Sequence, residues 1–251
     1  MESRFFTAPA IAVGLILLTA SGVARAQLTD AERKCSDAVN KRSRNIGNQE
    51  QKKNRACVKD GIGDIDSCID IEGDKTATQQ AKLVEVFGSG GKCETPPPFG
   101  VNPDPQSIAD STARATRNVL RGAFGDPVDG IIPNDNCQQK VAKRTGKMFD
   151  TEMKAFRKCT KDLAAINNTA NIEACIGTGV ADPKAQTVVE PKIESDMAAC
   201  DFSGGAPPGF EDGGCSGCSD AATCATCLGH LVNCQVCQRS VFKPACSPIV
   251  M

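Results

Sequence analysis

The chain has 251 residues, enough for one or two domains, and its formal net charge of −1 does not mark it as basic or acidic overall. It contains fifteen cysteines and one histidine but neither Trp nor Tyr. A hydrophobic core without these large rings is thin, so we expect disulfides to supply part of the stability. The only histidine, His230, lies in a cysteine-rich region, which excludes a Ser-His-Asp set. We therefore expect no enzymatic activity and predict no catalytic residue.

Residues 1–26 have the pattern of a secretory signal peptide. Arg4 gives a positive start, residues 8–20 form an apolar run, and Ala24-Arg25-Ala26 is a typical cleavage site, so Gln27 is expected to begin the mature chain. The apolar run is too short to span a membrane. The sequence therefore predicts a secreted or periplasmic protein, cleaved between Ala26 and Gln27, whose cysteines are oxidised.

Two cysteine intervals each occur twice in the mature chain. The pairs 22 positions apart are Cys35/Cys57 and Cys137/Cys159, and the pairs 25 positions apart are Cys68/Cys93 and Cys175/Cys200. The residues around them also agree, since the segment Ile65–Ile69 recurs with conservative changes as Ile172–Ile176. This agreement predicts an internal repeat, with residues 27–93 as the first copy and residues 137–200 as the second.

The helical spacing of apolar residues and cysteines predicts an all-α fold. The predicted helices cover residues 29–60, 76–87, 107–123, 137–166 and 183–199. Thr29 or Asp30 can cap the first helix and Gly61 can end it, while Pro191 is expected to kink the last. Residues 94–136 combine a proline-rich linker with a bridging helix, which we expect to pack on one or both copies.

The same intervals predict which cysteines pair. At 100° per residue, 22 and 25 positions are close to whole numbers of helical turns, so the cysteines of each interval lie on one face. A helix between Cys35 and Cys57 keeps their Cα atoms too far apart for a direct bond. An antiparallel helical hairpin in each copy gives nested pairs instead. The predicted disulfides are Cys35–Cys93, Cys57–Cys68, Cys137–Cys200 and Cys159–Cys175.

Charge is sorted along each copy. Residues 27–59 and 137–161 are basic, whereas residues 60–93 and 162–200 are acidic. We expect each basic helix to lie against the acidic return segment of its own copy. The basic helices are also candidates for binding an anionic surface polymer such as lipopolysaccharide, a polysaccharide or nucleic acid, although a basic run is more often a solvated face. The sequence names no other partner.

An acidic stretch follows the first predicted helix. Its members are Asp60, Asp64, Asp66, Asp70, Glu72 and Asp74. Their spacing does not fit the EF-hand calcium loop, because Cys68 holds a ligand position. We therefore expect a solvated acidic turn rather than a calcium site.

Residues 201–251 comprise a Gly/Pro linker and a tail that we expect to be irregular and cross-linked. The tail cysteines are Cys215, Cys218, Cys224, Cys227, Cys234, Cys237 and Cys246. Cysteine counting does not determine how they pair. In the alternative interpretation, Cys215, Cys218, Cys234 and Cys237 have the spacing of a tetrahedral zinc site. The oxidising compartment favours disulfides, so no metal or cofactor is the leading expectation.

The tail holds an odd number of cysteines once the two copies have used theirs. An odd cysteine in a secreted protein indicates a free thiol or an intermolecular bridge. Cys246 lies outside the C-x-x-C pattern and is the candidate. A disulfide-linked dimer through Cys246 is therefore one hypothesis.

These motifs carry two resemblances. The hairpins resemble twin-cysteine helical hairpins in design, but their cysteines lie further apart, so no function is carried over. The segments Phe124–Gly130 and Cys137–Lys143, with the cysteine-dense tail, resemble uncharacterised secreted cysteine-rich repeat proteins of Gram-negative bacteria, which implies secretion and no known activity. We expect a non-enzymatic structural or binding module stabilised by disulfides, with a zinc-binding protein as the alternative.

Overall fold

The computed structural model describes residues 29–61, 64–94, 104–165 and 185–238. Its elements, in chain order, are α1 (Asp30–Asp60), α2 (Ile65–Asp70), α3 (Asp74–Phe87), α4 (Pro105–Phe124), α5 (Asn136–Ala165), the π-helical turn η1 (Ala185–Val189), α7 (Glu190–Met197) and α8 (Ala221–Gln238). No β-strand occurs within these ranges, so the predicted all-α class is confirmed. None of the helices in the described ranges has a stretch apolar and long enough to cross a membrane.

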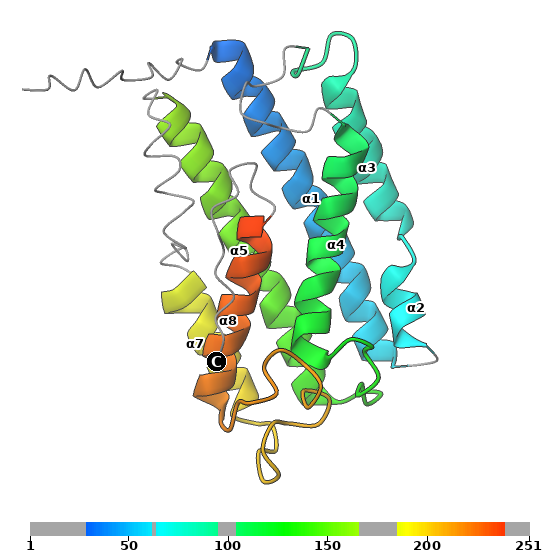
Figure 1. Cartoon of the computed structure of the whole chain (residues 1–251), viewed down its shortest axis with the longest axis vertical. Helices are drawn as coiled ribbons and strands as arrows, with labels where there is room; N and C mark the ends of the chain where they lie inside the picture. Colours follow the sequence, from blue (N-terminus) through cyan, green and yellow to red (C-terminus); the bar gives the residue numbers. More distant parts are fainter. Residues whose placement is uncertain (1–28, 62–63, 95–103, 166–184, 239–251) are drawn as a thin grey trace, which may run out of the picture.

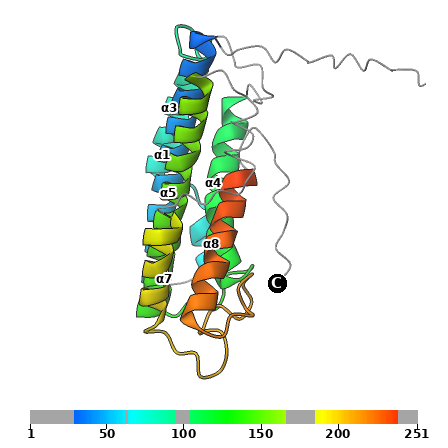
Figure 2. The same cartoon turned by 90° about the vertical axis from the view of Figure 1, so that its left-hand side faces the viewer.

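The helices form two layers. Figure 2 places α1, α3, α5 and α7 in one layer and α4 and α8 in the other. The long helices α1 and α5 lie side by side in the first layer and run in opposite directions (Figure 1). Arg44 of α1 pairs with Asp150 of α5, and Asp37 of α1 pairs with Arg157, so the two helices are held in antiparallel register.

Local signals fix both ends of α1. Thr29 and Glu32 form a capping box, in which the Thr29 hydroxyl accepts from the Glu32 N–H and the Glu32 carboxylate accepts from the Thr29 N–H. Gly61 ends the helix in the left-handed conformation, with φ of 54°. The predicted helix 29–60 therefore agrees with the observed one to within a residue.

The segment after α1 turns back along it. Asp64 caps the short helix α2, which lies where an acidic turn is expected from the sequence, and α3 then runs antiparallel to α1 (Figure 1). The structure contains the disulfides Cys57–Cys68 near the turn and Cys35–Cys93 at the open end, with Cα atoms 5.9 and 4.6 Å apart. Both belong to the set expected from the cysteine intervals.

The segment before Cys200 returns along the first half of α5. It consists of η1 and α7, with Pro191 in the first turn of α7, so the chain changes from π to α geometry where a kink was expected. The disulfide Cys137–Cys200 joins this segment to the start of α5, with Cα atoms 5.4 Å apart. The fourth expected pair, Cys159–Cys175, lies outside the described residues.

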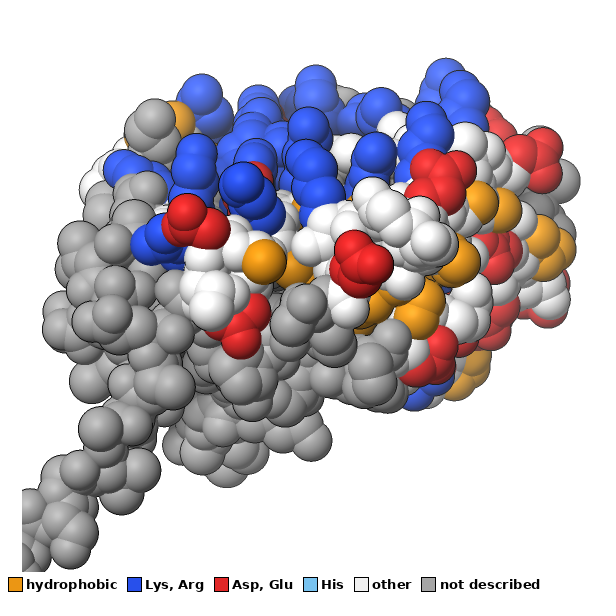
Figure 3. Space-filling model, turned by 90° about the horizontal axis from the view of Figure 1, so that it is seen from above, with side chains coloured by type: hydrophobic (Ala, Val, Ile, Leu, Met, Phe, Trp, Pro, Cys, Tyr) orange, Lys and Arg blue, Asp and Glu red, His pale blue; other side chains and the backbone are white. Residues whose placement is uncertain are grey.

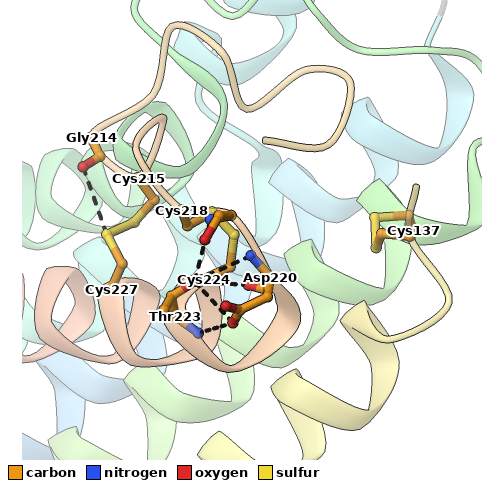
Figure 4. The surroundings of a disulfide bond; sticks show 10 residues. Cys137, Gly214, Cys215, Cys218, Asp220, Thr223, Cys224 and Cys227 are labelled. Carbon is orange, nitrogen blue, oxygen red and sulfur yellow. Dashed lines mark hydrogen bonds between the residues drawn. A yellow bond between two sulfur atoms is a disulfide. The ribbon is translucent and has the colours of Figure 1, made fainter. Parts of the chain in front are cut away.

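Helix α8 corrects the expectation of an irregular tail. Residues 221–238 are helical because Cys224, Leu228 and Val232 recur at intervals of four and form a buried face. Asp220 caps the helix by accepting from the N–H of Thr223 (Figure 4). The C-x-x-C spacing, which suggests an irregular cross-linked tail, also suits one side of a helix.

The bridging helix α4 joins the two halves. It packs on α1 and α3 on one side and on α8 on the other. A large apolar cluster surrounds its second half and includes Phe124, whose ring lies 4.8 Å from that of Phe210. A smaller cluster around Leu83 and Ala109 fills the open end of the first hairpin. The first layer is thus backed by apolar packing on one side and faces solvent on the other.

Candidate anion-binding face

Helix α1 presents different residues in different directions. Glu50 points toward α3 and α4, where it contacts Thr76 and Arg117, and Arg44 points toward α5. At 100° per residue, Lys34, Lys41, Lys52 and Lys59 lie on the remaining side, away from α4. All four side chains are exposed. One side of α1 is therefore a row of lysines.

Helix α5 carries a matching row. Phe149 and Met153 are buried toward the interior, and Asp150 faces α1. The lysines recur at steps of three, four and seven, which keeps them on the outward side of the helix. They are Lys140, Lys143, Lys147, Lys154, Lys158 and Lys161, of which only Lys140 is half-buried.

The two rows form one surface because α1 and α5 are neighbours. Figure 3 shows Lys and Arg side chains gathered along one side of the molecule. We define the basic face as these two rows of lysines together with the exposed Arg55. The register of the Arg44–Asp150 pair places lysine opposite lysine, for example Lys52 opposite Lys143 and Lys41 opposite Lys154. Within the described residues, Lys154 is the only member of the face that forms an ion pair.

Two aspartates, Asp37 and Asp150, lie in the seam between α1 and α5, and each forms an ion pair with an arginine. Burial disfavours the charged form of Asp150, but hydrogen bonds from Arg44, Lys154 and Asn48 outweigh it and lower its pKa to about 2. The hydrogen bond from Arg157 likewise lowers the pKa of Asp37. Both carboxylates therefore stay ionised and paired at neutral pH. They hold the two helices together and leave most of the lysines uncompensated.

Each basic helix lies against the described part of its own return segment, as expected, but few ion pairs join the two. Of the ion pairs between helices, only Arg144–Asp196 links a basic helix to the return segment of its own copy. The others join α1 to α5, α1 to α4, or α2 to α4. Composition gives each segment its net charge, but packing decides which side of a helix faces its partner. The basic side of α1 faces solvent rather than α3.

A buried glutamate was missed by the sequence reasoning. Glu50 has no exposed surface and accepts hydrogen bonds from Lys53, Arg117 and Thr76 at 2.7, 2.8 and 3.1 Å. The Lys53 ammonium also donates to the carbonyls of Ile69 and Ile71. This cluster ties α1 to α3, α4 and the end of α2. The predicted repeat offers one signal for it, because Glu152 lies at the same offset as the cysteines of the second copy, and the structure buries both glutamates.

Part of the acidic stretch makes structural contacts, whereas the rest is solvated as expected. Asp64 caps α2, while Asp66 and Asp70 both pair with Arg121 of α4. Asp66 also accepts from the N–H of Val128 at 3.0 Å. These carboxylates attach the turn of the first hairpin to α4. Within the described ranges, no cluster of His, Cys, Asp and Glu is arranged to hold a metal ion.

The tail cysteines rule out the alternative zinc site in this structure. Cys215 is bonded to Cys227 and Cys218 to Cys224, so each bond joins the loop before α8 to the helix itself (Figure 4). A sulfur in a disulfide is not a thiolate ligand, and two of the four proposed zinc ligands are therefore lost.

The structure describes only some of the other tail residues. Cys234 is half-buried on α8, and His230 is exposed there. The side chain of Cys237 and all of Cys246 lie outside the described residues, so the Cys246 dimer stays a hypothesis.

A cavity of about 240 Å³ lies at the end of the second hairpin. Its lining includes the Cys137–Cys200 disulfide, Asp135, Asp201 and Lys140. The lining holds charges of both signs and no nucleophile placed beside a base. The basic face is the more distinctive feature, because it gathers one sign of charge over two helices.

Comparison with known proteins adds no assignment. No family model, curated protein or solved structure matches this chain. The disulfides of the described residues indicate an oxidising compartment, outside the cell or in the periplasm. The fold is a disulfide-stabilised helical module whose chief surface feature is the basic face.

Proposed function

We propose that the protein is an exported, non-enzymatic module that binds an anionic surface polymer through the basic face. Export follows from the signal peptide expected over residues 1–26, with cleavage between Ala26 and Gln27. The observation that carries the proposal is the alignment of two lysine rows on neighbouring helices, with few carboxylates to balance them.

The energetics of the face favour a ligand over a purely solvated surface. Like charges on adjacent helices repel and lower the stability of the compact state. The seam carboxylates attract Lys154, Lys41 and Lys161, but they are shared with Arg44 and Arg157 and so balance only part of this charge. A polyanion laid on the face would offset it. An ordinary solvated helix side would instead mix both signs of charge.

The scaffold suits binding rather than catalysis. Disulfides hold the open ends of both hairpins, and the Glu50 cluster fixes α1 to its neighbours. The lysine rows are therefore presented on a rigid layer. A rigid surface loses little conformational entropy when it binds an extended ligand.

A heparin column provides the first test, because heparin is a linear sulfated polyanion. We expect the exported chain to be retained at low ionic strength and to elute in modest salt, since exposed charges are screened within about 10 Å at 0.1 M. Replacing Lys41, Lys52, Lys147 and Lys158 by Gln should abolish retention. The matched control replaces Lys75, Lys82, Lys92 and Arg114, which lie on α3, α4 and the turn after α3.

The control loses the same charge from another part of the molecule. If both variants lose retention equally, binding follows overall charge and the basic face is not the site. Passage of the unmodified chain through the column without retention would refute the proposal outright.

A further inference from the structure

We propose that the basic face adsorbs to the surface of an anionic lipid bilayer. This inference rests on the proposed function and names the polyanion as a planar array of phosphate-bearing headgroups. It begins from the layered arrangement of the helices. Figure 2 shows α1, α3, α5 and α7 in one layer, so the outward sides of α1 and α5 point in the same direction.

The dimensions of the face favour a ligand that extends in two directions. The row from Lys34 to Lys59 is about 37 Å long and the row from Lys140 to Lys161 about 32 Å, at 1.5 Å per residue. Packed helix axes lie roughly 8–10 Å apart. A linear chain can lie between rows this close, but its charges follow one line along the face. A surface that carries anionic groups in two dimensions engages both rows at once.

The residue types point the same way. All members of the face are lysines except Arg55. A lysine ammonium is a flexible point charge, which suits mobile headgroups, whereas the fixed fork of arginine suits oriented recognition of individual phosphates. The chain has no Trp or Tyr, so it lacks the large aromatic side chains that stack on nucleic-acid bases or sugar rings. These properties favour charge-driven adsorption over recognition of a base or sugar.

Apolar insertion is not part of the proposed binding mode. Among the described residues, the large apolar side chains with high exposure are Ile71, Val84, Ile132 and Val188, and none belongs to α1 or α5. The face therefore rests on the headgroups by electrostatic attraction alone. Each lysine that reaches an anionic surface raises the partition coefficient roughly fivefold, and the effect fades within a Debye length.

Co-sedimentation with large vesicles tests the inference. The probes are vesicles of phosphatidylcholine alone and of phosphatidylcholine with a third of phosphatidylglycerol. We expect the full exported chain to bind the anionic vesicles at low salt and to be released by 0.5 M NaCl. Binding to the neutral vesicles at the same level would overturn the inference, because adsorption would then not depend on lipid charge.

Two variants test whether both rows take part in vesicle binding. One replaces Lys34, Lys41, Lys52 and Lys59 of α1 by Gln, and the other replaces Lys143, Lys147, Lys158 and Lys161 of α5. Because a planar ligand uses both rows, each variant should lower vesicle binding by at least about a hundredfold. The control replaces Lys75, Lys82, Lys92 and Arg114 and should retain most of the binding. Thermal unfolding followed by circular dichroism checks that each variant is folded.

Each remaining outcome separates this inference from the proposed function. Retention on heparin without binding to anionic vesicles overturns the lipid inference and leaves the proposed function standing. Full vesicle binding by either row variant also overturns it, since one row would then suffice. If the chain binds neither heparin nor anionic vesicles, both proposals are refuted.

Discussion

The two sides of α1 differ in the environment of their charged residues. On the inner side, Glu50 is fully buried, and three donors from α1, α3 and α4 satisfy its carboxylate. On the outer side, two residues further on, Lys52 is exposed, and the register set by Arg44–Asp150 puts it level with the exposed Lys143 of α5. The inner charges are paired and shielded from water, whereas the outer ones are of one sign and hydrated.

This difference separates charges that hold the fold from charges that are available to a ligand. A buried carboxylate is costly to desolvate and is retained only with its partners in place, so changing it should affect stability. Exposed lysines contribute little to folding, so changing them should affect binding instead. The disulfides add a covalent connection between α1 and the segment that returns along it, which neither kind of charge provides.

Removal of the Cys35–Cys93 disulfide is the change with the largest expected effect on stability. This bond closes a separation of 58 residues, and the loss of loop-closure entropy predicts a cost of about 4 kcal/mol for the double Cys→Ser variant. Urea unfolding measures it. The control is the double Ser variant at Cys218 and Cys224, six positions apart, for which the same relation predicts about 2 kcal/mol. Equal losses would mean that the inner ion cluster, and not the staple, holds α3 against α1.

Glu50→Ala tests the inner side directly. It leaves Arg117 and Lys53 without their common carboxylate, and we expect a loss of about 3 kcal/mol in the free energy of unfolding. Lys52→Ala is the matched control on the outer side of the same helix and should change stability by less than about 0.5 kcal/mol. Thermal and urea unfolding at neutral pH provide the comparison. If the two variants were equally stable, the contrast between the sides of α1 would disappear.

Asp150 lies between the two sides, and its contribution should depend on pH. Its pKa in the folded protein is about 2, below the ordinary 3.8, so its pairing stabilises the fold above pH 4 and this contribution is lost as the pH falls toward 2. The difference corresponds to about 2 kcal/mol. Asp150→Asn should therefore lower stability at neutral pH and flatten its dependence on pH between 4 and 2. An unchanged acid transition would show that the Arg44–Asp150 pair does not tie α1 to α5.

The sequence predicted the long helices and their ends because those signals are local. The capping pattern at Thr29 and Gly61 in its left-handed turn act within the terminal turns, and the cysteine intervals match the helical period along the whole helix. Helix α8 was missed because its cysteines were interpreted by their chemistry, although their spacing also suits a buried helical side.

The candidate site was predicted only in part, for a different reason. Net charge identified the basic helices, but which way each helix turns depends on tertiary packing. The two lysine rows form one face because the Arg44–Asp150 and Arg157–Asp37 ion pairs join α1 to α5, and such pairs between distant segments cannot be predicted from net charge. Glu50 reads in a sequence as a surface residue, because unpaired acidic side chains are seldom buried. Only the buried Glu152 at the equivalent offset distinguishes it.

The smallest expected effect tests the outer side. If Lys52 and Lys143 face each other across the seam, each repels the other, and replacing either by Gln should raise stability slightly, by a few tenths of a kcal/mol at low salt. The double variant should gain less than the sum of the single changes, because the second substitution removes a charge whose opponent is already gone. Urea unfolding of all four proteins gives this coupling energy.

The dependence of this coupling energy on salt concentration shows whether it comes from repulsion between the two lysines. Repulsion between hydrated charges weakens as the Debye length falls to about 3 Å at 1 M, so the coupling should vanish there, whereas the cost of Glu50→Ala should persist because its cluster is shielded from water. Lys52→Gln paired with Lys75→Gln is the control, since Lys75 lies on α3. Additive effects at low salt for Lys52 and Lys143 would place the two rows on separate surfaces. A planar anionic ligand could not then engage both rows together.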